Sequence, residues 1–91
     1  MDHSSISIMI AAINEEAGIG PTLSELNNSF KNSYCLVVDS NSNDKTAFIA
    51  QKLGAHVIYQ NGQGKGNAIS EGLKHINDIT KYLVFTDGDF T

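Results

Sequence analysis

Short apolar runs alternate along the chain with longer stretches that repeat apolar residues at helical spacing. The runs are rich in β-branched residues, which favours strands, and they are apolar at most positions, which is typical of strands buried on both faces. They are residues 6–13, 34–38, 56–59 and 82–86. The stretches between them carry apolar residues three or four positions apart, which predicts amphipathic helices. A helix between each pair of successive strands predicts a parallel sheet covered on both faces.

The three predicted helices have recognisable faces and ends. Their apolar faces are Ile19, Leu23, Leu26 and Phe30 in the first, Ala47, Phe48, Ala50 and Leu53 in the second, and Ala68, Ile69, Leu73 and Ile76 in the third. We place Pro21 in the first turn of the first helix, where a proline is tolerated. Asp44 can cap the second helix, and Gly54 is the expected stop of that helix.

Polar residues gather after the predicted strands. In parallel α/β sheets, ligands bind outside the carboxyl ends of the strands. The conspicuous polar residues at those ends are Asn14, Glu15, Asp39, Lys65, Asp87 and Asp89. Because four strand ends converge on one edge of such a sheet, their polar residues predict a binding site there.

Length, composition and charge narrow the class of protein. A chain of 91 residues makes one small domain, and 41% hydrophobic with 18% charged residues is typical of a globular protein. The net charge of −4 argues against a nucleic-acid partner and requires local cations or a metal if the ligand is a phosphate. The lone Cys35 is interpreted as a small buried hydrophobe in a reducing cytoplasm. The longest apolar run, Ile8 to Ile13, is too short to span a bilayer.

Asp87 and Asp89 form a pair of carboxylates just past the fourth strand. Such a pair supplies hard oxygen ligands for Mg²⁺ or Mn²⁺, which can in turn hold phosphate oxygens. The alternative is a solvated turn in which Gly88 supplies a positive φ. The convergence of the other strand ends favours the metal site.

Three further residues have both a binding and a structural interpretation. Asp39 can accept a hydrogen bond from a base or a ribose hydroxyl, or it can cap its own loop. Glu15 can bind a ribose hydroxyl, or its negative charge can stabilise the positively charged N-terminal end of its helix. Lys65 lies in a Gly-rich loop that is not a Walker A motif. It can place a cation beside a diphosphate at a helix N-terminus, or remain a solvated surface lysine.

Four motifs, taken in order, resemble the nucleotide-binding half of the family 2 glycosyltransferases of the GT-A fold, in particular the dolichol-phosphate mannosyltransferase subgroup. They are residues 10–16, residues 37–46, residues 64–68 with Gly72 and Leu73, and residues 84–89. The resemblance implies an α/β fold, a Rossmann-like parallel sheet with helices on both faces, truncated after the fourth strand. It implies a hexosyltransferase that takes a GDP- or UDP-sugar as donor.

The resemblance also implies a set of site residues. The substrate-binding residues would be Ala11, Ala12, Asn14, Glu15, Asp39, Lys65, Asp87 and Gly88. Asp87 and Asp89 would hold Mg²⁺ or Mn²⁺, with Asp89 the direct ligand of a cation that bridges the diphosphate. The metal would act as a Lewis acid that neutralises the departing nucleoside diphosphate. No catalytic residue is implied within this chain.

The sequence departs from the family pattern at four positions and in length. Ala11 stands where the family has proline, Ser40 where it has Gly or Asp, Lys45 where it has Gly, and Gly88 where it has Ala. Family members continue past this point with an acceptor-binding half. We therefore expect residues 1–91 to form a single donor-binding half, inactive as a transferase by itself. The acceptor is left open, with a lipid phosphate at the membrane periphery as one case, and the edge of the fourth strand could mediate homo-oligomerisation.

Two other functions compete with this interpretation. A haloacid dehalogenase-like phosphatase would use Asp87 as nucleophile and Asp89 as general acid. That motif normally opens its domain, whereas here it comes last. The second alternative is a non-catalytic module or remnant that binds a sugar nucleotide without turnover.

Overall fold

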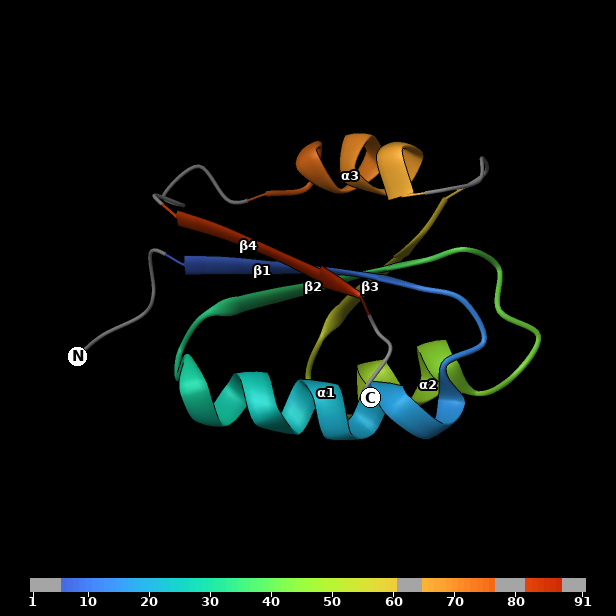
Figure 1. The fold of residues 1–91 in the computed structure, drawn as a ribbon, viewed down its shortest axis with the longest axis horizontal. Coiled ribbons are helices and arrows are strands. Elements are labelled where there is room, and N and C mark those ends of the chain that lie inside the picture. Colours follow the sequence, from blue (N-terminus) through green and yellow to red (C-terminus); the bar gives the residue numbers. More distant parts are fainter. Residues whose placement is uncertain (1–5, 61–64, 77–81, 88–91) are drawn as a thin grey trace.

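The computed structural model describes residues 6–60, 65–76 and 82–87 of the chain. Strands and helices alternate along these residues (Figure 1). The elements are β1 (Ile6–Ala12), α1 (Glu16–Ser29), β2 (Tyr34–Asp39), α2 (Thr46–Lys52), β3 (His56–Tyr59), α3 (Lys65–Leu73) and β4 (Tyr82–Asp87). The strands form one parallel sheet in the order β3-β2-β1-β4. The predicted α/β architecture is therefore confirmed, and β4 lies at an edge of the described sheet.

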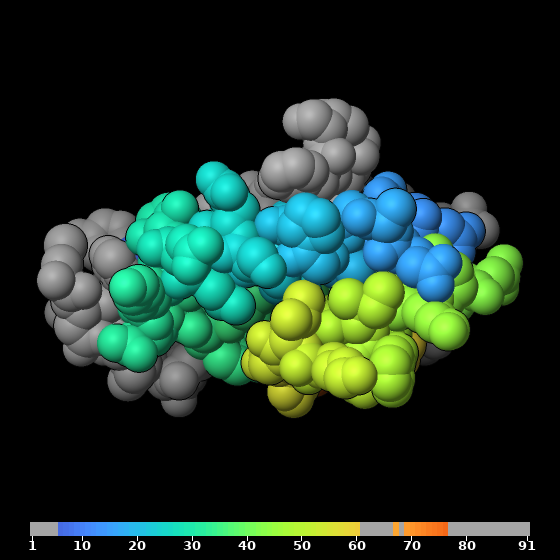
Figure 2. Space-filling view, turned by 90° about the horizontal axis from the view of Figure 1, so that it is seen from below, coloured from blue at the N-terminus to red at the C-terminus, as the bar shows by residue number. Residues whose placement is uncertain are grey.

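Helices cover both faces of the sheet. Helices α1 and α2 lie next to each other on one face (Figures 1 and 2), and α3 lies on the other (Figure 1). The core beneath α1 and α2 consists of Ile8, Ile10, Ala12, Ile19, Leu23, Val37, Ala50 and Ala55. The smaller core on the α3 side consists of Met9, Leu36 and Val38. Alternate residues of β1 and β2 thus point to opposite cores, as the two-residue period of a strand requires.

Cys35 behaves as a small hydrophobe. It is partly buried and packs against the core beneath α1 and α2. Burial raises the pKa of its thiol to about 11, because the thiolate would lose its hydration. The thiol therefore remains protonated near neutral pH and is a poor nucleophile.

The predicted position of Pro21 was wrong. Helix α1 begins at Glu16, so Pro21 lies inside the helix and not in its first turn. A proline there cannot donate a backbone hydrogen bond to the preceding turn. The helix begins earlier than expected because the carbonyl of Glu15 accepts the N–H groups of Gly18 and Ile19, at 3.0 and 2.8 Å.

Some residues that were predicted to be buried are exposed. Ile13, predicted as the end of the first strand, lies after β1 and is 55% exposed, and Phe48 of the apolar face predicted for α2 is 59% exposed. Leu53 and Leu73, at the ends of α2 and α3, are also exposed. Helix α2 packs through Ala50, and Lys52 lies over the Phe48 ring, with its Nζ 5.6 Å from the ring centroid. A helix of this length buries only a narrow row of side chains against the sheet, so the apolar side chains beside that row are exposed to solvent.

Gly72 lets α3 approach the sheet closely. A Cβ atom at this position would lie 2.5 Å from Sδ and 2.8 Å from Cε of Met9, which is fully buried on β1. Real Cβ atoms do not approach other atoms this closely, and the close-packed core leaves the Met9 side chain little room to move. Gly20 on α1 differs, since a Cβ there would meet Ile49 and Leu53 at ordinary contact distances of 3.8 and 3.9 Å.

The two glycines yield a matched prediction. We expect Gly72→Ala to destabilise the domain, because overpacking costs about 1–3 kcal/mol and exceeds the helix-propensity gain of alanine, about 1 kcal/mol. Gly20→Ala should instead raise the free energy of unfolding by up to about 1 kcal/mol. Urea unfolding of both variants measures the difference. Equal stabilisation by the two substitutions would show that α3 does not press on Met9.

Candidate functional site at the carboxyl ends of the strands

The strand register brings the carboxyl ends of the sheet together. Asp39, the last residue of β2, pairs with Ala12 of β1 and with Tyr59 of β3. Asp87, the last residue of β4, pairs with Ala11 on the other side of β1. The two aspartates therefore flank β1, separated by two strand spacings, or about 10 Å. Gly88 and Asp89 lie outside the described residues, as do the side chains of Lys65 and Asp87.

Asp39 is a buried carboxylate, 1% exposed, that organises the loop after β2. Its Oδ2 accepts the backbone N–H of Ser42 at 2.9 Å, and its Oδ1 accepts the Ser42 hydroxyl at 2.6 Å. This is the loop-capping arrangement that the sequence offered as one of two interpretations. Each carboxylate oxygen can accept a second hydrogen bond, so capping leaves acceptor capacity for a ligand. Contact between Asp39 and a nucleoside stays a prediction.

The loop after β1 is joined to the loop after β2. Asn14 adopts the left-handed conformation, with φ of 50°, which asparagine tolerates better than most residues. Its backbone N–H donates to Ser42 Oγ, and its Oδ1 accepts the N–H of Asn43, both at 2.8 Å. The N–H of Ser40 donates to the carbonyl of Ala12 at 2.9 Å. The structure shows that Asn14 joins the two loops, and its predicted role as a pocket residue stays a prediction.

Asp44 and Thr46 complete this junction at the start of α1. The N–H of Glu16, the first residue of α1, donates to Asp44 Oδ2 at 3.1 Å, and that of Glu15 donates to Thr46 Oγ1 at 2.9 Å. Glu15 itself makes no side-chain capping bond to α1. A residue of one loop thus caps the helix that follows the other, so displacing either loop would leave helical N–H groups without partners.

Asp44 also binds the first residue of α2, from the position before the N-cap residue Lys45. Its Oδ1 accepts the N–H of Thr46, at 3.0 Å, and the Thr46 hydroxyl. The Thr46 hydroxyl, helped by the N–H groups of Thr46 and Glu16, lowers the pKa of the Asp44 carboxyl below its ordinary value. These donors all stabilise the ionised form. Sequence analysis predicted Asp44 as the cap of this helix, whereas the N-cap residue is Lys45 and Asp44 bonds Thr46 from one position earlier. Its contact with α1 was missed, because that contact depends on tertiary structure.

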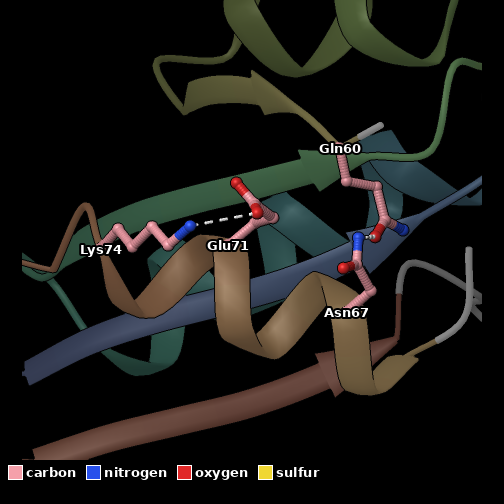
Figure 3. A network of polar contacts seen from close by, with 4 residues as sticks. All are labelled: Gln60, Asn67, Glu71 and Lys74. Carbon is pink, nitrogen blue, oxygen red and sulfur yellow. Dashed lines mark hydrogen bonds and ion pairs between the residues drawn. The ribbon is translucent and has the colours of Figure 1, made fainter. Parts of the chain in front are cut away.

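Gln60 is a site-edge residue that sequence analysis missed. It follows β3 and is 1% exposed. Its Nε2 donates to Ser40 Oγ, and its Oε1 accepts the side-chain amide of Asn67 on α3 (Figure 3). Its backbone N–H donates to the carbonyl of Asp39 at 3.0 Å, and its carbonyl accepts Asn41 Nδ2 at 3.1 Å. A lone polar residue at a strand end gives no sequence signal that distinguishes this role from that of a surface glutamine.

The other predicted site residues have simpler positions. Ala11 and Ala12 belong to β1, and Ala12 is buried in the core beneath α1 and α2. Lys65 is the first residue of α3. Within residues 6–60, 65–76 and 82–87, no three His, Cys, Asp or Glu side chains form a metal-binding group. The Asp87–Asp89 metal site stays a prediction, because Asp89 lies outside this part of the chain.

The fold and the polar strand ends define an α/β domain with a ligand site at the carboxyl edge of a parallel sheet. The family model described as "Glycosyl transferase family 2" matches residues 7–91. The chain therefore belongs to glycosyltransferase family 2. This match confirms the resemblance found in the motifs and favours it over the phosphatase-like alternative.

Similar proteins support this assignment. Glycosyltransferase AglJ of Haloferax volcanii is 36% identical over 89 residues, which are 96% of this chain and 28% of the relative. The dolichyl-phosphate hexose transferase of Haloferax volcanii is 34% identical over 86 residues, 94% of this chain and 37% of the relative. The chain thus spans between 28% and 37% of the length of these two curated relatives.

A solved structure confirms the GT-A type of fold. Glucosyl-3-phosphoglycerate synthase from Mycobacterium tuberculosis, in complex with Mn²⁺, UDP and glucosyl-3-phosphoglycerate, is similar with a TM-score of 0.83 and 28% identity. The similarity covers 96% of this chain and 34% of the synthase. Another structure of the synthase contains Mg²⁺ and UDP, with a TM-score of 0.80, 28% identity and coverage of 93% and 33%. In this chain, the described helices include none long and apolar enough to cross a membrane.

The junction between the loops yields a pH-dependent prediction. The pKa of Asp44 is lower in the folded chain, so its ionised form adds stability above the unfolded pKa of about 3.9. That contribution is lost as the pH falls through the folded pKa. We expect Asp44→Asn to be less stable than the parent at pH 7, with a difference that shrinks as the pH falls below about 4. Urea unfolding across this range measures it.

Glu25 provides the control for this experiment. It is an exposed acid on α1 and has no side-chain hydrogen bond in the part of the chain that the structure describes. Glu25→Gln should leave the pH dependence of stability close to that of the parent. If Asp44→Asn kept the full pH dependence of the parent, the contribution of the Asp44 carboxylate would be refuted.

Proposed function

We propose that this chain is the donor-binding part of a glycosyltransferase and binds a nucleoside-diphosphate sugar, with GDP or UDP as the nucleotide. The proposal rests on family membership and on similarity to a synthase whose structures contain UDP with Mn²⁺ or Mg²⁺. Transfer of the sugar to an acceptor is proposed for the whole protein, since the chain spans about a third of that synthase.

The observation that carries the proposal is the position of Asp39 and Asp87 on either side of β1. A nucleoside diphosphate is an extended ligand, with a base and ribose that need hydrogen-bond acceptors and a diphosphate that needs positive charge. Asp39, anchored within its loop, suits the base or ribose end. The backbone of Asp87 is two strand spacings, or about 10 Å, from that of Asp39. Asp87 suits the diphosphate end if a cation lies between its carboxylate and the phosphates.

The residues at the β4 end fit a divalent cation in their chemistry. Carboxylate oxygens are the ligands that Mg²⁺ and Mn²⁺ prefer, and Asp87 with Asp89 would supply them. The chain carries a net charge of −4, so a diphosphate beside these carboxylates requires a counter-charge. When bound, the metal would neutralise charge on the departing nucleoside diphosphate.

The remaining residues shape the pocket. The backbones of Ala11 and Ala12 and the loop through Glu15 would line the nucleoside side, because they lie between the two aspartates. The hydrogen bonds between Asn14, Ser42 and Asn43 hold this wall in place before a ligand arrives. A wall fixed in advance lowers the ordering cost of binding. Lys65, at the start of α3, would place its charge near the diphosphate.

Isothermal titration of the chain with UDP and GDP, each with and without Mn²⁺, tests the proposal. We expect one nucleotide to bind more tightly in the presence of Mn²⁺. Asp89→Ala should weaken this binding at least about tenfold, or about 1.4 kcal/mol, because the cation loses its direct ligand. The remaining binding should no longer respond to Mn²⁺.

Glu25→Ala is the matched control, since it removes one acidic charge from the exposed face of α1, away from the strand ends. It should bind nucleotide as the parent does. Failure of a folded parent chain to bind either nucleotide would refute the donor-binding proposal. If Asp89→Ala and Glu25→Ala lost the same amount of affinity, the metal site would be refuted, while the proposal that the chain binds a nucleotide would stand.

A further inference from the structure

We propose that Gln60 is a positioning residue that sets the separation between the Asp39 loop and the first turn of α3, and thereby the separation between the nucleoside and diphosphate sides of the site. The inference rests on the proposed function. It assigns a role to a buried residue that neither the motifs nor the predicted site contains.

Gln60 is bonded through both its backbone and its side chain. The backbone N–H and carbonyl bind Asp39 and Asn41, which fixes the residue to the end of β2. The side-chain amide then has one donor contact, to Ser40, and one acceptor contact, from Asn67. Because the side chain is 1% exposed, water cannot replace these partners, so the amide is held in one orientation.

The two side-chain partners belong to opposite sides of the proposed site. Ser40 directly follows Asp39, which is proposed for the nucleoside. Asn67 lies two residues after Lys65, in the first turn of α3, which is proposed for the diphosphate. Figure 3 shows Gln60 reaching from the end of β3 toward Asn67 on α3. The single Gln60 side chain therefore connects both sides.

Helix α3 has a different attachment at each end. Near its C-terminal end, Gly72 rests on the buried Met9 side chain. Near its N-terminal end, Asn67 donates a side-chain hydrogen bond to Gln60 and so joins the first turn of the helix to the end of β3. The Lys74–Glu71 ion pair, at 3.3 Å, stays within residues 65–76. Without Gln60, the first turn could shift while the Gly72 end remains packed.

Such a shift would act on the phosphate end of a ligand more than on the nucleoside. The loop of Asp39 keeps its own bonds to Ser42 when Gln60 is replaced. The first turn of α3 loses its anchor and moves with Lys65. Gln60 is therefore expected to control the preference for a diphosphate over a monophosphate, rather than nucleotide binding as such.

The test compares diphosphate with monophosphate binding in four forms of the chain. UDP, UMP, GDP and GMP are titrated with Mn²⁺ into the parent, Gln60→Met, Asn67→Ala and the control Gln51→Met. Gln51 is an exposed glutamine on α2. We expect the diphosphate-to-monophosphate affinity ratio to fall about two- to fivefold in Gln60→Met and Asn67→Ala, the size of a lost interaction at a helix terminus. Gln51→Met should keep the parent ratio.

The ratio separates positioning from a merely structural role. Partial unfolding would weaken the binding of diphosphate and monophosphate by the same factor and leave the affinity ratio unchanged. Asn67→Ala keeps the buried Gln60 in place, so it tests the link even if Gln60→Met folds poorly. If the parent binds nucleotide and Asn67→Ala leaves the affinity ratio unchanged, the positioning role of Gln60 is overturned, while the proposed function stands. A folded parent that binds none of the four nucleotides would overturn both this inference and the proposed function.

Discussion

The site depends on the hydrogen bonds that join the loop after β1 to the loop after β2. The loops that follow parallel strands lie at the same edge of the sheet, but strand pairing alone does not fix the distance between them. Here the side chains of Asn14, Ser42, Asp44 and Thr46 supply acceptors for backbone N–H groups of the opposite loop or helix. The first N–H of α1 is bonded to Asp44, which precedes α2. The same contacts therefore hold the two helices together and fix the carboxyl edge of the sheet.

The architecture could be predicted because it depends on the apolar pattern. Alternation of buried strands with helical stretches required a parallel sheet, and the comparison with solved structures agrees. The edge of the sheet that carries the candidate site could be predicted, because strand ends define it, and Asp39 and Asp87 lie at this edge. The sequence left two interpretations of Asp39 open, because an aspartate at a strand end can bond its own loop or a ligand, and only the structure shows its bonds to Ser42.

The errors also have physical causes. Apolar residues at helical spacing predicted buried faces for Phe48 and Leu73, yet short helices on a small sheet expose their flanks. Pro21 suggested a later helix start, yet α1 begins at Glu16, where the Glu15 carbonyl accepts the first helical bonds and Asp44 of a distant loop accepts the Glu16 N–H. Gln60 was missed for the same reason. Its importance comes from partners 20 residues before it and 7 after it in sequence, and no local pattern encodes such partners.

The departures from the family pattern are consistent with this dependence on side-chain contacts. Ala11 replaces the usual proline, but it lies within β1 and pairs with Val38 and Asp87, so the turn is formed later, by Asn14. Lys45 replaces a glycine at a φ of −90°, which any residue adopts without strain. Ser40 replaces glycine or aspartate, and its hydroxyl is the partner of Gln60, a contact that glycine could not make. In this chain, hydrogen bonds of Asn14 and Ser40 hold the loops at the sheet edge, after β1 and after β2.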